Sequence, residues 1–125
     1  MRVLLVEDQA ALRGAVTQVL EHHGHQVFQA EHATQALDIF HAEHPDLLLL
    51  DVVLPDQDGY WLARQIREAE GAQWTPIIFL SSMDHDVDLW QGIEAGGDDY
   101  LIKGVAGAVL WKLVCEQQRE GRGDR

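Results

Sequence analysis

Residues 46–51 read Asp-Leu-Leu-Leu-Leu-Asp, and this stretch decides the fold class. Four consecutive leucines between Pro45 and Pro55 are typical of a strand that is buried on both faces. Such strands occur in parallel sheets that have helices on both sides. Because Asp51 directly follows the leucines, its carboxylate is expected where the strand leaves the core, at the rim of the sheet.

Strand-like and helix-like segments alternate along the rest of the chain. Apolar runs predict strands over residues 2–6, 26–29, 46–50, 76–80 and 99–102. Apolar residues at helical spacing predict helices over residues 9–22, 33–42, 59–69, 86–95 and 106–119. This alternation with short connections predicts an α/β fold, a doubly wound five-stranded parallel sheet with helices on both faces.

The length of 125 residues suits one domain with one core. We predict that this domain spans residues 1–119. Residues 120–125 are charged and glycine-rich, and they are expected to form a C-terminal tail or the start of a linker to an absent output domain.

The composition excludes some partners and locations. The net charge of −12 argues against direct nucleic-acid binding, because phosphate contacts need clustered Lys and Arg. No apolar run approaches the roughly 20 residues needed to span a bilayer, so no membrane partner is expected. The single cysteine, Cys115, cannot form an internal disulfide. The sequence therefore predicts a cytoplasmic protein.

Carboxylate, hydroxyl or amine side chains follow four of the predicted strands. They are Glu7 and Asp8 after the first of these strands, and Asp51, Ser81 and Lys103 after the other three. The carboxyl ends of parallel strands share one edge of a sheet, which is where open α/β folds bind ligands. Three carboxylates gathered there repel one another unless a cation lies between them. Magnesium prefers oxygen ligands and keeps positions open for phosphate oxygens.

The same residues resemble machinery for phosphoryl transfer, in which charge on the phosphoryl oxygens must be neutralised. Asp51 is the best candidate for the nucleophile, which would form an acyl phosphate. Lys103 would pair with one phosphoryl oxygen, and Ser81 would donate a hydrogen bond to another. Magnesium would bridge the third.

The order of these motifs resembles the receiver domain of bacterial two-component response regulators over essentially residues 1–119. The resemblance rests on Glu7-Asp8, on residues 51–59 (DVVLPDQDG), on residues 76–82 (PIIFLSS) and on residues 97–103 (GDDYLIK). It implies a flavodoxin-like fold with strand order 2-1-3-4-5. It also implies transfer of a phosphoryl group to Asp51 from a histidine kinase or phosphotransfer protein. Apart from its own phosphorylation and autodephosphorylation, such a domain is not expected to be an enzyme.

The resemblance also implies roles for single residues. Asp8 and Asp51 would bind magnesium directly, with the backbone carbonyl of Val53, and Glu7 would act mainly through water. Ser81 and Tyr100 would change conformation when the phosphoryl group arrives. This change would bias a surface made by residues 86–95, 99–102 and 106–119.

One position departs from the family pattern. Gly104 follows Lys103, where the family usually has a proline in a cis peptide. A cis peptide bond before a residue other than proline costs roughly 2.5–4 kcal/mol. The sequence therefore leaves open whether the Lys103-Gly104 peptide bond is cis or trans. A degenerate receiver that acts without phosphate is therefore an alternative. Ser82, where alanine is common, would slightly narrow access to the phosphoryl group.

The helix expected at residues 106–119 is apolar on more than one face. One helix packed on a sheet buries only one stripe, so part of this surface is expected to contact a second copy or an output domain. The interface candidates are Trp90, Val109, Trp111 and Leu113.

Other functions fit the sequence less well. Residues 94–100 resemble receivers coupled to diguanylate cyclases, so a regulatory domain of a larger enzyme is an alternative, and a DNA-binding output is equally compatible. A flavodoxin would not have the acidic pair Glu7-Asp8 at its phosphate loop. A haloacid-dehalogenase-like phosphatase would need an aspartate where Val53 stands. The histidines at residues 22–25 have no ligand spacing that favours zinc.

Overall fold

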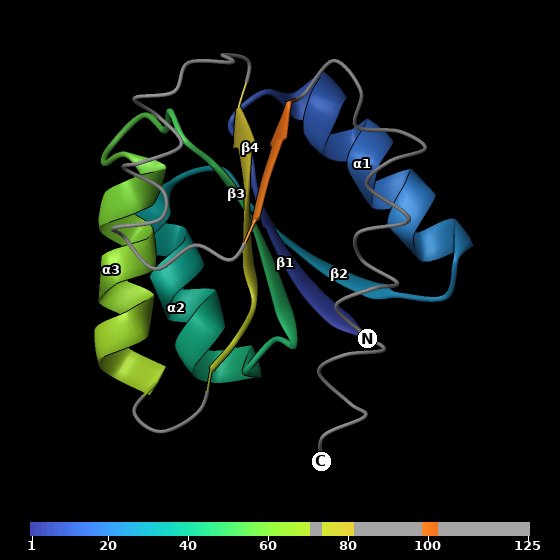
Figure 1. Ribbon diagram of the computed structural model, residues 1–125. Coiled ribbons are helices and arrows are strands. Elements are labelled where there is room, and N and C mark those ends of the chain that lie inside the picture. Colours follow the sequence, from blue (N-terminus) through green and yellow to red (C-terminus); the bar gives the residue numbers. More distant parts are fainter. Residues whose placement is uncertain (71–73, 82–98, 103–125) are drawn as a thin grey trace.

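Parallel strands form one sheet in the order β2-β1-β3-β4-β5 (Figure 1). This computed structural model describes residues 1–70, 74–81 and 99–102. The elements are β1 (Arg2–Val6), α1 (Ala10–His22), β2 (Gln26–Ala30), α2 (Ala33–Glu43), β3 (Leu47–Asp51), α3 (Gly59–Glu70), β4 (Ile77–Ser81) and β5 (Asp99–Ile102). The predicted helices at residues 86–95 and 106–119 lie outside the described residues.

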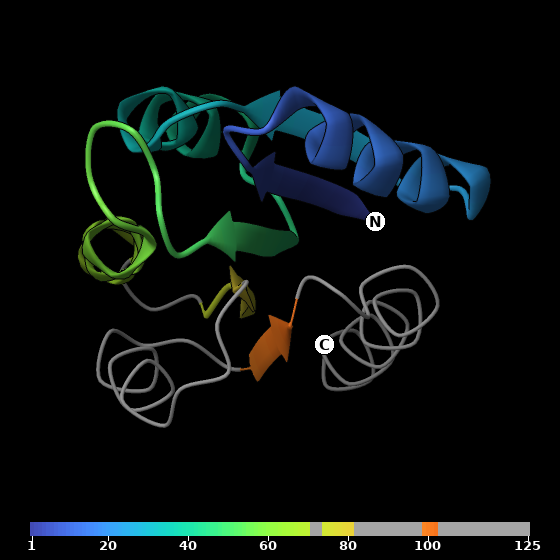
Figure 2. The ribbon, with the colours of Figure 1, turned by 90° about the horizontal axis from the view of Figure 1, so that it is seen from above.

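The three described helices cover both faces of the sheet. Helix α1 lies on one face, and α2 and α3 lie side by side on the other (Figures 1 and 2). Neighbouring residues of a strand point to opposite faces, so the leucines of β3 contribute to both layers. Leu48 and Leu50 pack toward α2 and α3, whereas Leu47 and Leu49 pack toward α1. This double burial is what the continuous leucine run predicted.

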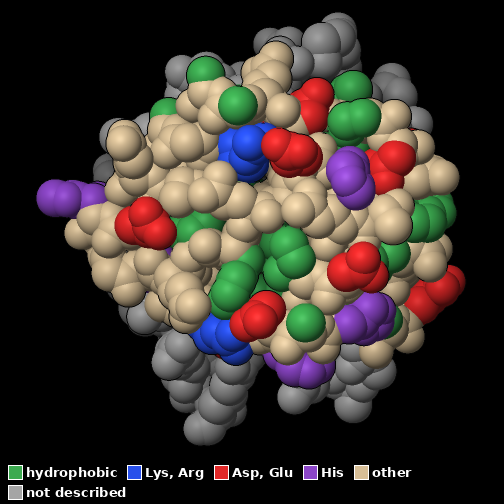
Figure 3. Space-filling view, turned by 180° about the vertical axis from the view of Figure 1, so that it is seen from behind, with side chains coloured by type: hydrophobic (Ala, Val, Ile, Leu, Met, Phe, Trp, Pro, Cys, Tyr) green, Lys and Arg blue, Asp and Glu red, His purple; other side chains and the backbone are tan. Residues whose placement is uncertain are grey.

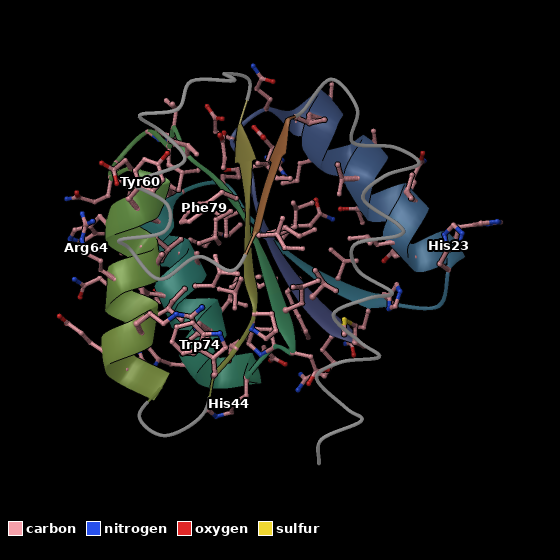
Figure 4. All side chains as sticks on the ribbon, viewed as in Figure 1. His23, His44, Tyr60, Arg64, Trp74 and Phe79 are labelled. Carbon is pink, nitrogen blue, oxygen red and sulfur yellow. The ribbon has the colours of Figure 1, made fainter. Side chains whose placement is uncertain are left out.

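Helix α3 packs on the sheet partly through an aromatic pair. The rings of Tyr60 in α3 and Phe79 in β4 meet edge to face, with centroids 5.0 Å apart (Figure 4). Both side chains are buried. The pair holds the start of α3, and with it the end of the preceding loop, against the centre of the sheet.

Local signals explain where α1 and α2 end. After α1, Gly24 has a φ of 88°, which glycine adopts without a steric penalty. After α2, His44 takes the left-handed conformation with a φ of 47°, and Pro45 then prevents the helix from continuing. Strand β3 begins at Leu47, one residue later than predicted. Just before it, the Asp46 carboxylate accepts a hydrogen bond from the Arg2 backbone N–H at 2.9 Å.

The carboxyl ends of the strands gather at one edge, which is the upper edge in Figure 1 and faces the viewer in Figure 2. This edge carries the loops that follow β1 and β3. None of the helices that the structure describes combines the length and the apolar character needed to cross a membrane.

Candidate functional site

Three carboxylates meet where β1 and β3 end. Strand pairing places Val6 beside Leu50, so the next residues, Glu7 and Asp51, come side by side where β1 and β3 end, and Asp51 is the last residue of β3. One carboxylate oxygen from each of Glu7, Asp8 and Asp51 lies within 4.8 Å of the other two. The structure thus brings together the three acidic residues that the sequence placed at this edge. Among the described residues, this is the group of His, Cys, Asp and Glu side chains with a spacing suited to a metal ion.

The three acids differ in their exposure to solvent. Glu7 is fully buried and Asp51 is 3% exposed, whereas Asp8 is exposed at the rim. Glu7 Oε2 accepts a hydrogen bond from the Gln9 backbone N–H at 2.9 Å. Asp51 Oδ1 accepts one from the Val53 backbone N–H at 3.1 Å. Burying two carboxylates this close together is costly, and a divalent cation would offset that cost.

The loop after β3 folds back over Asp51. The Val52 backbone N–H donates to the Leu80 carbonyl oxygen at 3.2 Å, which extends the sheet by one bond. The Gly59 N–H donates to the Val52 carbonyl oxygen at 2.8 Å and so closes the loop. Val53 remains 70% exposed, beside the carboxylates. Its backbone is therefore held close to Asp51 while its side chain faces solvent.

Asp56 ties this loop to helix α2, a role that the sequence did not reveal. Its carboxylate accepts hydrogen bonds from the backbone N–H groups of Ala33 and Thr34 at 2.9 and 3.0 Å and from the Thr34 hydroxyl at 2.7 Å. Gln57 N–H adds a fourth bond at 2.9 Å. Although burial raises the pKa of Asp56, the hydrogen bonds from Thr34, Ala33 and Gln57 lower it far below its usual value. Asp56 thus supplies acceptors for the first N–H groups of a helix distant in sequence, next to the N-cap residue His32.

The remaining predicted site residues are placed only in part. Ser81 is the last residue of β4 and pairs with Ile102 of β5, while Tyr100 pairs with Phe79. The side chains of Ser81 and Tyr100 lie outside the described part of the structure, as do Lys103, Gly104 and the peptide bond between them. The interface candidates Trp90, Val109, Trp111 and Leu113 also lie outside them, as does Cys115.

The histidines near the end of α1 lie away from the three carboxylates. The rings of His22 and His23 meet edge to face, with centroids 5.3 Å apart. His25 is buried, and its Nδ1 lies 2.9 Å from the N-terminal amine of Met1. Within the part of the chain that is described, the group of side chains spaced to hold a metal ion contains no histidine.

Acidic side chains and histidines are interspersed on the face opposite the view of Figure 1, and the Lys and Arg side chains visible there lie against acidic ones (Figure 3). Two Arg–Glu ion pairs occur among the described residues. Arg2 pairs with Glu43 at 2.6 Å, and Arg13 pairs with Glu31 at 3.2 Å.

Comparisons with known proteins agree with this geometry. The family model described as the response regulator receiver domain matches residues 3–114. The transcriptional regulatory protein YxdJ of Bacillus subtilis is 37% identical over 123 residues, which cover 98% of this chain and 52% of that protein. Protein PilH of Pseudomonas aeruginosa is 33% identical, and the match covers 90% of this chain and 93% of PilH. The chain thus spans about half the length of the first curated relatives that it matches.

Solved structures show the same fold. A CheY-like response regulator receiver domain protein from Methanospirillum hungatei aligns with a TM-score of 0.91 at 26% identity, covering 99% of this chain and 98% of that one. The BeF3-activated N-terminal receiver domain of Klebsiella pneumoniae RstA aligns with a TM-score of 0.87 at 31% identity, covering 95% and 99%. The fold, the sheet order and the family match confirm the flavodoxin-like architecture expected from the sequence. This chain belongs to the family of response regulator receiver domains.

Proposed function

We propose that Asp51 is the phosphoacceptor of this receiver and that magnesium assists the transfer. One observation carries the proposal: the nearly buried Asp51 ends the central strand with oxygens of Glu7 and Asp8 within 4.8 Å. The phosphodonor would be a phosphohistidine of a histidine kinase or of a phosphotransfer protein. Two buried carboxylates and one exposed carboxylate suit a site in which a bound cation balances the negative charge.

The donor set fits magnesium. All the available ligand atoms are oxygens, and magnesium is usually held by one or two carboxylates with several waters. Asp8 and Asp51 would bind it directly, together with the backbone carbonyl of Val53, and Glu7 would act through water. When bound, magnesium would supply positive charge to the phosphoryl oxygens. The exposure of Asp8 and Val53 leaves this side of the site open to solvent and to a phosphodonor.

In the transfer itself, an Asp51 carboxylate oxygen attacks phosphorus as the bond from phosphorus to the donor nitrogen breaks. The electron pair of that bond remains on the imidazole nitrogen. The product is an acyl phosphate on Asp51. The hydrogen bond from Val53 N–H to Asp51 Oδ1 at 3.1 Å orients the carboxylate for this attack.

The switch remains part of the proposal. Ser81 and Lys103 would contact the phosphoryl oxygens, and Tyr100 would change its conformation in response. The affected surface would include Trp90, Val109, Trp111 and Leu113, where a second copy or an output domain would bind. Lys103-Gly104 is the position at which a degenerate receiver would differ from a working one.

A transcriptional output is favoured over a diguanylate cyclase. YxdJ of Bacillus subtilis and AfsQ1 of Streptomyces coelicolor are both named transcriptional regulatory proteins, and this chain matches 52% of each. We infer that the receiver acts with a DNA-binding output, while the receiver itself makes no nucleic-acid contact. Action in the cytoplasm stays a prediction.

The proposal is tested by incubating the protein with magnesium and acetyl phosphate and measuring its intact mass. We expect one phosphoryl adduct on the wild type, none on Asp51→Asn, and one on Asp38→Asn, an exposed aspartate of α2 that serves as control. An adduct that survives in Asp51→Asn would contradict the assignment. A wild type that gains no adduct and binds no magnesium would favour the degenerate receiver.

A further inference from the structure

One guanidinium group joins the acidic loop to the neighbouring strand. Arg13 Nη1 donates hydrogen bonds to the carbonyl oxygens of Glu7 at 2.8 Å and Asp8 at 3.5 Å. Its Nε donates to Gln29 Oε1 at 3.2 Å, and its Nη2 to Glu31 Oε1 at 3.2 Å. The Arg13 side chain is 13% exposed. This nearly buried side chain therefore joins α1 to the loop after β1 and to the end of β2.

These bonds restrain the two residues that present carboxylates to the site. The loop between β1 and α1 contains only residues 7–9, and its first residue is tied to β2 by the bond from Glu7 N–H to the Ala30 carbonyl oxygen at 3.0 Å. Arg13 adds a second tie, through the carbonyl groups of Glu7 and Asp8. Because each carbonyl group lies in a planar peptide unit with the Cα atoms on either side of it, holding these carbonyls restricts the positions from which the carboxylates extend.

We propose that Arg13 is a positioning residue for the acidic site. It holds Glu7 and Asp8 in the arrangement that binds a cation together with Asp51, and it does not itself contact the phosphoryl group. The inference rests on the proposed function, because it concerns the magnesium that the site would bind. The four acceptors of Arg13 require a planar fork of N–H donors, which lysine cannot supply.

The sign of the effect separates positioning from simple electrostatics. A positive charge beside a cation site repels the cation, so removing the charge of Arg13 would tighten magnesium binding if charge alone mattered. Loss of positioning has the opposite effect. Groups that orient metal ligands typically change metal affinity by roughly 10- to 100-fold when they are removed.

The test compares Arg13→Met with Arg2→Met. Both variants remove one positive charge and one ion pair with a glutamate. Arg2, however, is the first residue of β1, where it pairs with Glu43 and lies over the ring of Phe28. Arg13→Lys retains the positive charge but lacks the planar fork of N–H donors. Magnesium affinity is measured by calorimetry, and the rate of phosphorylation by acetyl phosphate is measured against magnesium concentration.

We expect magnesium to bind roughly 10-fold or more weakly to Arg13→Met, and more weakly also to Arg13→Lys, with Arg2→Met close to wild type. The maximal rate at saturating magnesium should change little, since Arg13 does not touch the reacting atoms. Without metal, hydrogen exchange of the Gln9 amide, which bonds to Glu7, should accelerate in Arg13→Met. If Arg13→Met does not fold, Arg13→Lys carries the test.

Equal or tighter magnesium binding by the Arg13 variants would overturn the inference and leave the proposed function intact. Failure of the wild type to bind magnesium would overturn both, and the wild-type measurement alone shows which case applies.

Discussion

Gly59 lies directly against the backbone of Asp51, with no space for a side chain between them. A Cβ atom on Gly59 would overlap the carbonyl oxygen of Asp51 and would lie 3.1 Å from the Cα atom of Val52. The first residue of α3 therefore closes over the end of β3. The Asp58 carboxylate stabilises this start of the helix by accepting a hydrogen bond from the Trp61 N–H at 2.7 Å.

Gly59→Ala is expected to destabilise the protein by about 1–3 kcal/mol, because two backbone segments must separate to admit the methyl group. The displacement would move Asp51, so phosphorylation should also slow. Urea unfolding measures the first effect, and the rate of adduct formation measures the second. Gly14→Ala is the control, since Gly14 is exposed in α1 with nothing within 4 Å of an added Cβ. It should stabilise by about 0.5–1 kcal/mol, and equal effects of the two substitutions would refute the explanation.

Asp56→Ala should lower the free energy of unfolding by about 1–2 kcal/mol, because the first N–H groups of α2 lose their acceptor. Asp38→Ala changes an exposed carboxylate on the same helix and is expected to have an effect within about 0.5 kcal/mol. Urea unfolding near neutral pH compares the two variants. Similar losses would mean that the bonds from Asp56 to α2 contribute little.

The contribution of Asp56 should also depend on pH. Hydrogen bonds hold its pKa in the folded protein well below the usual value of 3.8, so the ionised form stabilises the fold. This stabilisation is complete above pH 3.8 and is lost as the pH falls from there through the folded pKa. The difference in stability between wild type and Asp56→Ala should therefore shrink in acid. A difference that stays constant down to acid pH would contradict this assignment.

His25 predicts a second pH effect, near neutrality. Burial, then the positive charge of the N-terminal amine, then His23 lower the pKa of His25 from its usual 6.5. The unfolded chain then takes up a proton more readily than the folded protein, so stability should fall as the pH drops below 6.5, until the folded pKa is reached. Urea unfolding above and below that pH should show a smaller fall for His25→Gln than for wild type. His41→Gln, an exposed histidine of α2, is the control. If the stability of His25→Gln falls with pH as much as that of the wild type, other titrating groups cause the fall.

We expect magnesium to stabilise the wild type, because the proposed site exists in the folded protein and not in the unfolded chain. At 100 times its dissociation constant the gain is about 2.7 kcal/mol, and a chelator should abolish it. Asp8→Asn should be at least as stable as wild type without magnesium, since one of three neighbouring like charges is removed, but it should lose most of the gain. Thermal unfolding with and without magnesium tests both, with Asp38→Asn as control. An equal gain in Asp8→Asn would remove Asp8 from the ligand set.

Much of the fold followed from the residue pattern. Each described strand lies within one residue of its predicted range, and β1 and β5 match at both ends. The runs of buried aliphatic residues, such as residues 47–50, are strong signals because each residue faces a helix layer. The meeting of Glu7, Asp8 and Asp51 was also predictable, since parallel strands place their carboxyl ends on one edge.

The ties that hold the site were not predictable from the sequence. In a linear sequence Arg13 and Asp56 look like ordinary solvated charges, and no periodicity distinguishes them. Arg13 contacts Gln29 and Glu31, 16 and 18 residues away, and Asp56 contacts Ala33, 23 residues away. Which charged side chain reaches which partner depends on how the loops cross at the sheet edge.

By itself the sequence determined the strands, the faces they bury and the edge at which the acids gather, because backbone periodicity and apolar burial are properties of local segments. Only the tertiary structure decided that Arg13 holds the loop after β1, that Asp56 holds the loop after β3 and that residue 59 must be glycine. These contacts join segments that are distant in the chain, and their distances exist only once the helices have packed on the sheet.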